Sequence, residues 1–305
     1  MKITVIGSSN TDMIIQVPRL PVPGETLLGG SFSTALGGKG ANQAVAAARA
    51  GGEVTYIGRV GNDVFGEQAL NGLKEDGINI DYAVKDPLVP TGVAQIVVDE
   101  EGKNIIVVAP GANQNLCEQD ITNAGKAILA SELLLLQLET PIQTVRFAAK
   151  FAFENHIRVM LNPAPAIPLD DELLSYISIL TPNKLEAESL TGISITDERS
   201  VELAGRILLE HGLARVIITL GSKGSMVIDN GGAEHVPAFR IKSVDTTAAS
   251  DVFNGAMAVA LAEGKNFYES VRFGNAAAAI STTRLGAQPS IPRREEIMEM
   301  LRNNP

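Results

Sequence analysis

Two glycine-rich segments carry the polar side chains best suited to act on a ligand. The first, Gly37-Gly-Lys-Gly-Ala-Asn42, stands where an alanine-rich helix is predicted to begin. Glycine lets a backbone approach a ligand closely, and the first turn of a helix presents N–H groups that have no helical partner. Lys39 and Asn42 add hydrogen-bonding side chains, so the segment is suited to a polyhydroxyl ligand. A simple glycine turn into a helix is the alternative for this segment taken alone.

The second segment, Val244-Asp-Thr-Thr-Ala-Ala-Ser-Asp-Val-Phe-Asn-Gly-Ala256, has small residues followed by an apolar helix that is predicted to begin near Asp251. An aspartate at a helix N-terminus is ordinarily a cap, which contributes ~1 kcal/mol. Here Asp245 and Asp251 bracket one turn, and the backbone amides of residues 248–251 would face a transferring phosphate. An aspartate in this place can accept a hydroxyl proton while the helix N-terminus stabilises the phosphate.

The elements that must position these segments alternate between strand and helix. Helices are predicted at 40–50, 65–76, 253–263 and 268–283, with the last two packed at the end of a sheet. This alternation favours a parallel sheet with helices on both faces, a doubly wound α/β fold. The predicted strands are the short apolar runs at residues 3–7, 54–57, 133–138, 159–162, 177–181, 216–220 and 225–228.

Two stretches depart from this alternation. Residues 10–36 are rich in proline and glycine, and residues 91–108 have the pattern of a β-hairpin around Asp99-Glu-Glu-Gly-Lys103. We expect both to contribute to a small separate sheet. The prediction is therefore a single α/β domain over residues 1–305 that carries a β lid inserted from about 10–36 and 91–108.

Composition limits the possible partners. The 305 residues have a formal net charge of −10 and no run rich in lysine or arginine, which disfavours nucleic acid and membrane surfaces as partners. The single cysteine, Cys117, excludes an internal disulfide, and no apolar run is long enough to span a bilayer. A strand follows Met1 directly, so we expect a cytoplasmic protein. Neither a Walker A spacing nor a Gly-x-Gly-x-x-Gly after the first strand is present.

The two glycine-rich segments, in this order, resemble the two signatures of the PfkB-type carbohydrate kinases, and further blocks resemble the ribokinase branch of that family. The resemblance covers roughly residues 2–293. The further blocks are Asn10-Thr-Asp12, Gly58-Arg-Val-Gly-Asn-Asp63, Leu138-Glu139, Thr181-Pro-Asn-Lys-Leu-Glu186, Thr219-Leu-Gly-Ser-Lys-Gly224 and Gly286-Ala-Gln-Pro-Ser290.

The resemblance implies a set of roles, each carried over by position. Asp251 would be the catalytic base and would also contact the sugar. The other sugar ligands would be Asn10, Asp12, Gly38, Lys39, Asn42 and Glu139. The ATP ligands would be Asn183, Thr219, Gly221, Gly224, Ser250 and Asn275. Taken singly, several of these residues have simpler interpretations as turn or hairpin formers.

The resemblance also implies two cations. Glu186, with Asn183, would help to order Mg²⁺ and the phosphates through water. A monovalent cation, usually potassium, would lie near the amides of the second segment, and oxygen ligands suit such a hard cation. Its ligands would match Asp245, Thr247, Ser281, Arg284, Gly286 and Ser290.

One departure from the family pattern stands in the second segment. Ser250 occupies a position that is commonly glycine, and Val252 replaces a threonine. A Cβ at residue 250 would take up space beside the γ-phosphate, or would strain the turn if the backbone there had a positive φ.

Two hypotheses of different class follow. The first is an ATP-dependent kinase that acts on the primary hydroxyl of D-ribose, with fructokinase, 2-keto-3-deoxygluconate kinase and nucleoside kinase as alternatives. The second is a sugar- or nucleotide-binding regulatory protein with impaired catalysis, which only Ser250 favours. The resemblance further suggests a homodimer formed through the lid sheets, since a small apolar sheet with one uncovered face needs a partner.

Overall fold

The computed structural model describes residues 1–101 and 103–304, and the strands in these ranges form a large and a small sheet. The large sheet is parallel except at one edge, where β12 and β13 run antiparallel. In order across the sheet its strands are β13 (Gly232–Val236), β12 (Ser225–Asp229), β11 (Arg215–Thr219), β10 (Ile179–Leu180), β9 (Arg158–Leu161), β8 (Leu133–Leu136), β1 (Lys2–Ile6), β4 (Glu53–Gly61) and β5 (Asn79–Asp86).

Both faces of the large sheet are buried under helices, because its central strands are apolar on both sides. In β1, Ile3 and Val5 contribute to one core and Ile6 to the other, as the two-residue repeat of a strand requires. Helices on the first face are α1 (Lys39–Arg49), α2 (Val64–Glu75), α9 (Ala249–Ala262), α10 (Phe267–Ser281) and α11 (Arg294–Asn303). Helices on the second face are α3 (Glu118–Asn123), α4 (Gly125–Leu129), α5 (Ile142–Glu154), α6 (Asp171–Ser175), α7 (Lys184–Thr191) and α8 (Glu198–Leu209).

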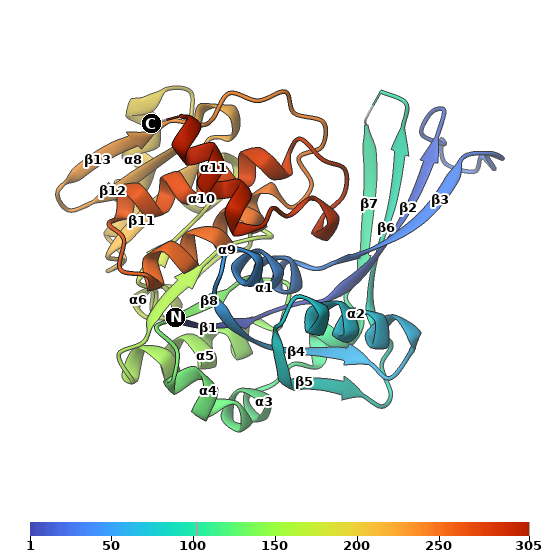
Figure 1. Ribbon diagram of the computed structural model, residues 1–305, viewed down its shortest axis with the longest axis horizontal. Helices are drawn as coiled ribbons and strands as arrows, with labels where there is room; N and C mark the ends of the chain where they lie inside the picture. Colours follow the sequence, from blue (N-terminus) through green and yellow to red (C-terminus); the bar gives the residue numbers. More distant parts are fainter. Residues whose placement is uncertain (102, 305) are drawn as a thin grey trace.

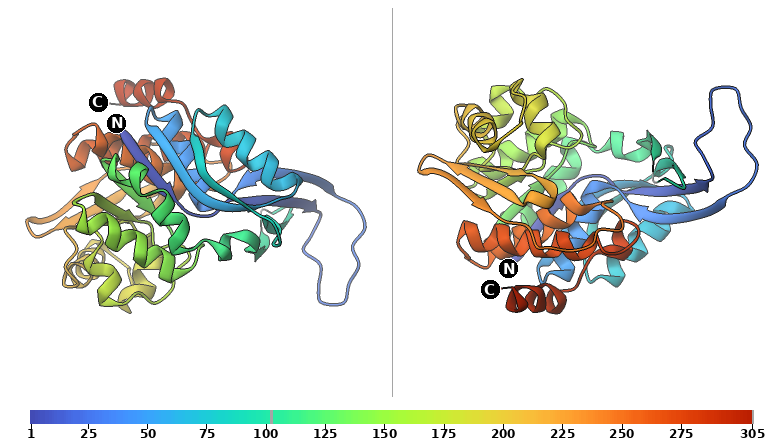
Figure 2. Two further views of the ribbon diagram at one scale, coloured as in Figure 1. Left: turned by 90° about the horizontal axis from the view of Figure 1, so that it is seen from below. Right: turned by 90° about the horizontal axis from the view of Figure 1, so that it is seen from above.

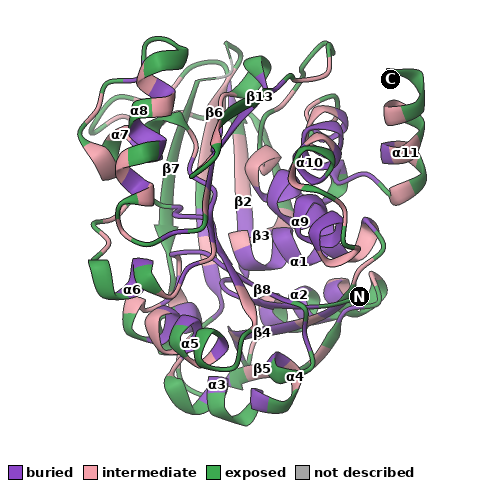
Figure 3. Ribbon diagram, turned by 90° about the vertical axis from the view of Figure 1, so that its left-hand side faces the viewer, coloured by how far each residue is buried: buried purple, intermediate pink, exposed green. Residues whose placement is uncertain are grey.

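The predicted doubly wound α/β fold is confirmed, with two corrections. The helices α9 and α10 do not pack at the end of the sheet. They cover one face beside α1, and the burial of α9 and α1 is visible in Figure 3. The edge strands β5 and β13 are missing from the sequence prediction, because their partly exposed residues lack a continuous apolar run.

The small sheet stands beside the large α/β body, as Figure 1 shows. It consists of β3 (Ser31–Gly37), β2 (Asn10–Val17), β6 (Gly92–Asp99) and β7 (Asn104–Ala109), in that order. These strands come from the two stretches that the sequence sets apart. The chain between β2 and β3 projects beyond the sheet as a long loop (Figure 2).

The helices α1 and α9 approach each other closely at a glycine. A Cβ added to Gly255 would lie 2.5 Å from the backbone oxygen of Gln43 and 2.8 Å from the backbone nitrogen of Ala47. Only glycine fits such a contact between two helix backbones. This approach brings the beginning of α9 against the first turn of α1.

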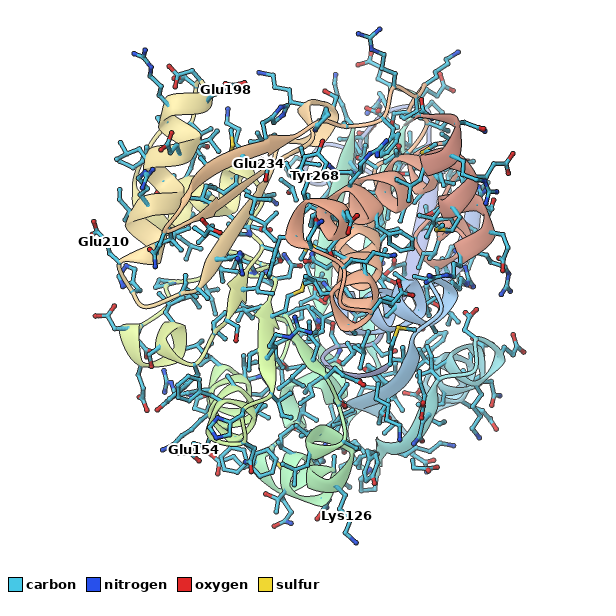
Figure 4. The ribbon with its side chains drawn as sticks, turned by 60° about the vertical axis from the view of Figure 1, so that its left-hand side comes forward. Lys126, Glu154, Glu198, Glu210, Glu234 and Tyr268 are labelled. Carbon is cyan, nitrogen blue, oxygen red and sulfur yellow. The ribbon has the colours of Figure 1, made fainter. Side chains whose placement is uncertain are left out.

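Charged side chains lie mainly at the periphery. Lys126, Glu154 and Glu210 are exposed and point away from the core in Figure 4. Within residues 1–101 and 103–304, no helix combines the length and apolar character needed to cross a bilayer. Short 3₁₀ turns complete the described chain at Gly111–Asn115 (η1), Gly221–Lys223 (η2) and Gln288–Ser290 (η3).

Candidate active site

The segment Gly37–Asn42 passes very close to the loop that follows β1, and this approach sets the position of its side chains. Gly38 has a φ of 89°, and a Cβ there would lie 2.7 Å from the backbone nitrogen of Asn10. A Cβ on Gly40 would lie 2.5 Å from the carbonyl carbon of Gly7. These glycines therefore allow α1 to begin directly over the carboxyl end of β1, with Lys39 and Asn42 in its first turns.

Asp251 lies in the first turn of α9 with its side chain buried. Its Oδ2 accepts a hydrogen bond from Nδ2 of Asn42 at 3.1 Å, and its Oδ1 accepts one from Nε2 of Gln43 at 2.9 Å. Burial raises the pKa of Asp251, while the Lys39 ammonium and the two amide donors act in the opposite direction. The carboxylate is thus both desolvated and held by donors, as a proton acceptor requires.

Gln43 is a residue that the sequence reasoning missed. Its one signal in the sequence is a polar side chain directly after Asn42 in an otherwise alanine-rich helix. The structure buries it completely between α1, α9 and the ends of the strands.

Two further carboxylates converge near Asp251. Oε2 of Glu139, which follows β8, accepts hydrogen bonds from the backbone nitrogen of Lys39 at 3.1 Å and from the Ser8 hydroxyl. Burial, together with the charges of Glu139 and Asp251, raises the pKa of Asp12 in β2 to about 6. Burial alone would lower the pKa of Lys39, but the surrounding carboxylates outweigh it and raise that pKa. The carboxylates of Asp12 and Glu139 and the ammonium group of Lys39 together form an acceptor-rich group, which we call the cradle.

The cradle also holds amide groups with capacity left for a ligand. Oδ1 of Asn42 is buried and has no hydrogen-bond partner among the described residues. Oδ1 of Asn10 accepts from Nδ2 of Asn113 at 2.8 Å, so the Asn10 amide can offer a ligand its nitrogen as a donor. Asn113 lies in η1 and is a second residue that the sequence reasoning missed; it also accepts from the backbone nitrogen of Ser9.

On the other side of the α9 N-terminus lies a cavity of about 340 Å³. All the residues predicted to bind ATP line it, and Lys184, Leu185, Thr246 and Ala249 are among their neighbours there. The predicted residues are Asn183, Thr219, Gly221, Gly224, Ser250 and Asn275.

A second cavity of about 470 Å³ adjoins the first, since both are lined by Gly221, Thr246, Ala249, Asn275 and Ala278. Its walls are mixed apolar and polar, a character suited to a purine base. A larger cavity of about 670 Å³, which includes Asp197 and His235, contains none of the predicted site residues.

The walls of the first cavity are built from helix and strand ends. Asn183 is the N-cap of α7 and forms a capping box with Glu186, in which each side chain accepts from the other's backbone nitrogen. Burial raises the pKa of Glu186, and the nearby charge of Asp251 adds to this effect. Thr219 ends β11 beside Asn183, and Oδ1 of Asn275 accepts from the Ser225 hydroxyl at 2.9 Å.

The residues predicted to bind potassium are brought together only in part. Oδ2 of Asp245 accepts from the backbone nitrogen of Gly286 at 2.8 Å, and its Oδ1 accepts from the backbone nitrogen and hydroxyl of Thr247. These contacts join the loop before α9 to the loop after α10. The side chains of three other predicted ligands make hydrogen bonds elsewhere. Ser281 donates to the carbonyl of Ala278, Ser290 donates to the carbonyl of Ala287, and Arg284 donates to Glu296.

The concern about strain at Ser250 is resolved by the backbone. Ser250 is the second residue of α9, and the described non-glycine residues with positive φ are His156 and Ala248. The left-handed position of the turn therefore belongs to Ala248, whose φ is 58°. A Cβ at Ser250 meets no backbone penalty, so backbone strain gives no reason to expect impaired catalysis.

Comparisons with known proteins agree over the full chain. The profile described as pfkB family carbohydrate kinase matches residues 1–294. The chain is 47% identical to a ribokinase of Haemophilus influenzae, over 98% of each chain. Its structure resembles a ribokinase of Thermotoga maritima (TM-score 0.89, 42% identity, 99% of each chain). It also resembles an Arabidopsis thaliana ribokinase complexed with ribose and ATP (TM-score 0.91, 32% identity, 98% of each chain).

A buried carboxylate between an acceptor-rich cradle and a cavity at a helix N-terminus, on this α/β fold, defines a sugar kinase that uses ATP. The chain belongs to the pfkB family of carbohydrate kinases.

The backbone at the α9 N-terminus predicts unequal effects of two glycine substitutions. Ala248→Gly relieves a left-handed conformation that costs an alanine about 1–2 kcal/mol, partly offset by the freedom glycine gains in the unfolded chain. Ser250→Gly places glycine inside a helix and should lower the free energy of unfolding by up to about 1 kcal/mol. Thermal unfolding should show a higher midpoint for the first variant and a lower one for the second. Faster turnover in the Ser250→Gly variant would contradict the conclusion that the Ser250 backbone is unstrained.

The raised pKa of Asp12 predicts that protein stability and sugar affinity change with pH in opposite directions. Its pKa is about 6 in the folded chain, against an ordinary value of 3.8 for an aspartate in water, so the folded state binds the proton first as pH falls. Protonation of Asp12 should thus add stability to the unliganded protein between pH 7 and 5, while removing an anionic acceptor from the cradle. Sugar affinity should fall on the order of tenfold over that range, the size expected for a charge-assisted hydrogen bond.

Titration calorimetry and thermal unfolding at several pH values measure both effects. Asp12→Asn is the matched control, because it keeps the shape of the side chain and cannot titrate. Wild-type protein whose sugar affinity changes with pH no more than that of the variant would refute the role of Asp12.

Proposed function

We propose that this chain is a ribokinase, which transfers the γ-phosphoryl group of ATP to the primary hydroxyl of D-ribose and yields ribose 5-phosphate and ADP. The observation that carries the proposal is the position of Asp251. Its buried carboxylate lies between the cradle of Asp12, Lys39 and Glu139 and the cavity lined by Ser250 and Asn183. The full-length similarity to ribokinases supports ribose over fructose, 2-keto-3-deoxygluconate and nucleosides as the substrate.

In the proposed complex the sugar lies in the cradle. Acceptors for its hydroxyl protons are the carboxylates of Asp12 and Glu139 and the buried Oδ1 of Asn42. Donors to its oxygens are the Lys39 ammonium and the amide nitrogen of Asn10, while Gly38 allows close approach of the backbone. A ligand with several hydroxyl groups matches this mixture of donors and acceptors.

The transfer step is assigned to the first turn of α9. Asp251 accepts the proton of the primary hydroxyl as the oxygen forms a bond to the γ-phosphorus and the bond from that phosphorus to the ADP oxygen breaks. In the described chain, Ala249 N donates to Thr246 and Val252 N to Ala248, whereas the backbone N–H groups of Ser250 and Asp251 have no partner. These two N–H groups are available to the charge that develops on the phosphoryl oxygens.

A divalent metal such as Mg²⁺ accompanies ATP in this family, and the residues present fit a metal held mainly by phosphates. The described residues contain no group of three or more His, Cys, Asp or Glu side chains that could bind a metal. Both oxygens of Glu186 accept hydrogen bonds from Asn183, so Glu186 would act through water. The ion would supply positive charge between the phosphates.

Potassium activation is part of the proposal, with Asp245 as the central ligand. Hydrogen bonds from Thr247 and Gly286 lower the pKa of Asp245 despite its partial burial, so this residue offers an ionised carboxylate. Ser281, Arg284 and Ser290 would contribute through backbone oxygens. A cytoplasmic location is also proposed, since the free Cys117 fits a reducing compartment.

We also propose that the small sheet acts as a lid on the single domain and as the contact of a homodimer. Every residue of β7 is exposed, and Ile105, Ile106, Val107 and Val108 form a continuous apolar strand. Phe32 of β3 is 65% exposed on the same sheet, and β7 is one of the two edge strands of that sheet. Such an edge is rarely left free in a monomer.

Asp251→Asn should abolish most turnover while preserving ligand binding. Removal of a general base lowers kcat on the order of 10²–10⁴-fold, and asparagine keeps the shape of the side chain. A coupled assay for ADP measures kcat, and calorimetry measures the affinities for ATP and ribose. Asp197→Asn, at the N-cap of α8, is the matched control for a simple capping role and should leave kcat unchanged. Turnover of Asp251→Asn within a few-fold of wild type would refute the assignment.

Replacement of potassium by a non-coordinating organic cation at equal ionic strength should lower the rate severalfold, because the ion would order the loops that Asp245 and Gly286 join. Asp245→Asn should lose most of this response. Identical kinetics of the wild-type protein in both salts would exclude the site.

Sedimentation at micromolar concentration should give twice the chain mass of 32.2 kDa. Ile106→Lys places a charge in the middle of β7 and should yield a monomer that remains folded. A monomeric wild-type protein would overturn the proposed dimer.

A further inference from the structure

A chain of buried side-chain amides leads to Asp251. It begins at Gln137, which follows β8, and continues to Gln43 on α1, where Nε2 of Gln137 donates to Oε1 of Gln43 at 2.7 Å. Nε2 of Gln43 donates to Oδ1 of Asp251 at 2.9 Å and to Oδ1 of Asn162 at 3.1 Å. All of these side chains are almost completely buried, so none of the amides is oriented by bulk water.

The orientation of each amide follows from a backbone carbonyl at one end. Nδ2 of Asn162 donates to the carbonyl oxygen of Thr181 at 3.1 Å, which can only accept. The oxygen of Asn162 must then face Gln43, and Gln43 must present its nitrogen to Asn162 and Asp251. Rotation of either amide by 180° would bring two oxygen atoms together in a buried place. The network therefore presents a fixed N–H to one oxygen of Asp251.

A second branch attaches the turn itself to the sheet. The Thr181 hydroxyl donates to Oδ1 of Asn254 at 2.6 Å, and Nδ2 of Asn254 donates to the carbonyl oxygen of Ser250 at 2.8 Å. Thr181 follows β10 and Asn162 follows β9, so the carboxyl ends of adjacent strands hold both the Asp251 carboxylate and the first turn of α9.

We infer that Gln43 is a positioning residue for phosphoryl transfer: it fixes Oδ1 of Asp251 as a hydrogen-bond acceptor and leaves Oδ2 to receive the substrate proton. This inference rests on the proposed role of Asp251 as the base. Oδ2 accepts only the longer bond from Asn42, at 3.1 Å, and Asn42 retains a free Oδ1 for the sugar. Gln43 is fully buried and acts through Asp251 without touching the substrate.

The electrostatic surroundings define what loss of Gln43 should do. The charged groups that act on Asp251 are Lys39 on α1, Glu139 after β8, Asp12 on β2 and Glu186 on α7. Lys39 favours the ionised carboxylate, whereas the acidic groups disfavour it. The bond from Gln43 also favours the ionised form, so its removal leaves Asp251 easier to protonate.

Gln43→Met keeps the length of the side chain and removes the donor. We expect kcat at neutral pH to fall about ten- to hundredfold, the size associated with a hydrogen bond to a buried charge. KM for ribose should stay within about threefold, because the cradle residues are unchanged. The acid limb of the kcat–pH profile should move to higher pH. Gln43→Asn, which keeps an amide but is one methylene too short to reach both partners, should move the same quantities by less.

Thr144→Val is the matched control for the loss of a buried hydrogen bond. The Thr144 hydroxyl donates to the carbonyl of Leu116 on the opposite face of the sheet, so the variant should lose stability without any change in the pH profile. Gln43→Met and Gln43→Asn could instead behave like Thr144→Val, with a loss of stability but no change in kcat or in the kcat–pH profile. Gln43 would then be merely structural, and the inference would be overturned. That result together with an inactive Asp251→Asn leaves the proposed function intact. An active Asp251→Asn refutes the proposed base and the role of Gln43 with it.

Discussion

The site depends on keeping a carboxylate ionised in a place where water cannot solvate it. Burial of Asp251 costs free energy unless donors replace the lost water, and this cost raises its pKa. Asn42 and Gln43, consecutive residues of α1, supply those donors. The arrangement requires α1 and α9 to meet closely, with their first turns side by side. Gly255 is the consequence, because a Cβ there would collide with the backbone of α1, while Gly40 lets α1 begin against the backbone of Gly7.

The same arrangement accounts for how an acidic protein can hold ATP. The chain has a net charge of −10, and exposed carboxylates such as those of Glu154 and Glu210 project into solvent at its periphery. A nucleotide polyphosphate therefore needs local positive potential, which the N–H groups of Ser250 and Asp251 would supply in the proposed complex. Cations that accompany ATP would extend this potential. The proposed potassium ligand Asp245 lies in the loop before α9, and the proposed water-mediated magnesium ligand Glu186 lies in the first turn of α7.

Polar side chains at the ends of parallel strands hold the side chains that contact Asp251 and the first turn of α9. Gln137, Asn162 and Thr181 follow β8, β9 and β10, where the carboxyl edge of an α/β sheet ordinarily carries function. Here they do not face the cavity. They hold Gln43 and Asn254, which in turn hold Asp251 and the Ser250 carbonyl. The sheet thereby fixes the Asp251 carboxylate and the first turn of α9 relative to each other.

The sequence by itself determined the α/β alternation, the two stretches of the small sheet, and the two segments that meet at the site. Apolar runs of strand length and glycines at helix starts are local signals, so they can be interpreted without knowing the fold. It did not reveal Gln43, Asn113 or the edge strands, nor that the left-handed residue is Ala248 and not Ser250. A buried glutamine in an alanine-rich helix is identical in sequence to an exposed one. Only the packing of α1 against α9 and the strand ends decides which atoms face Asp251, because that packing joins residues more than 200 positions apart.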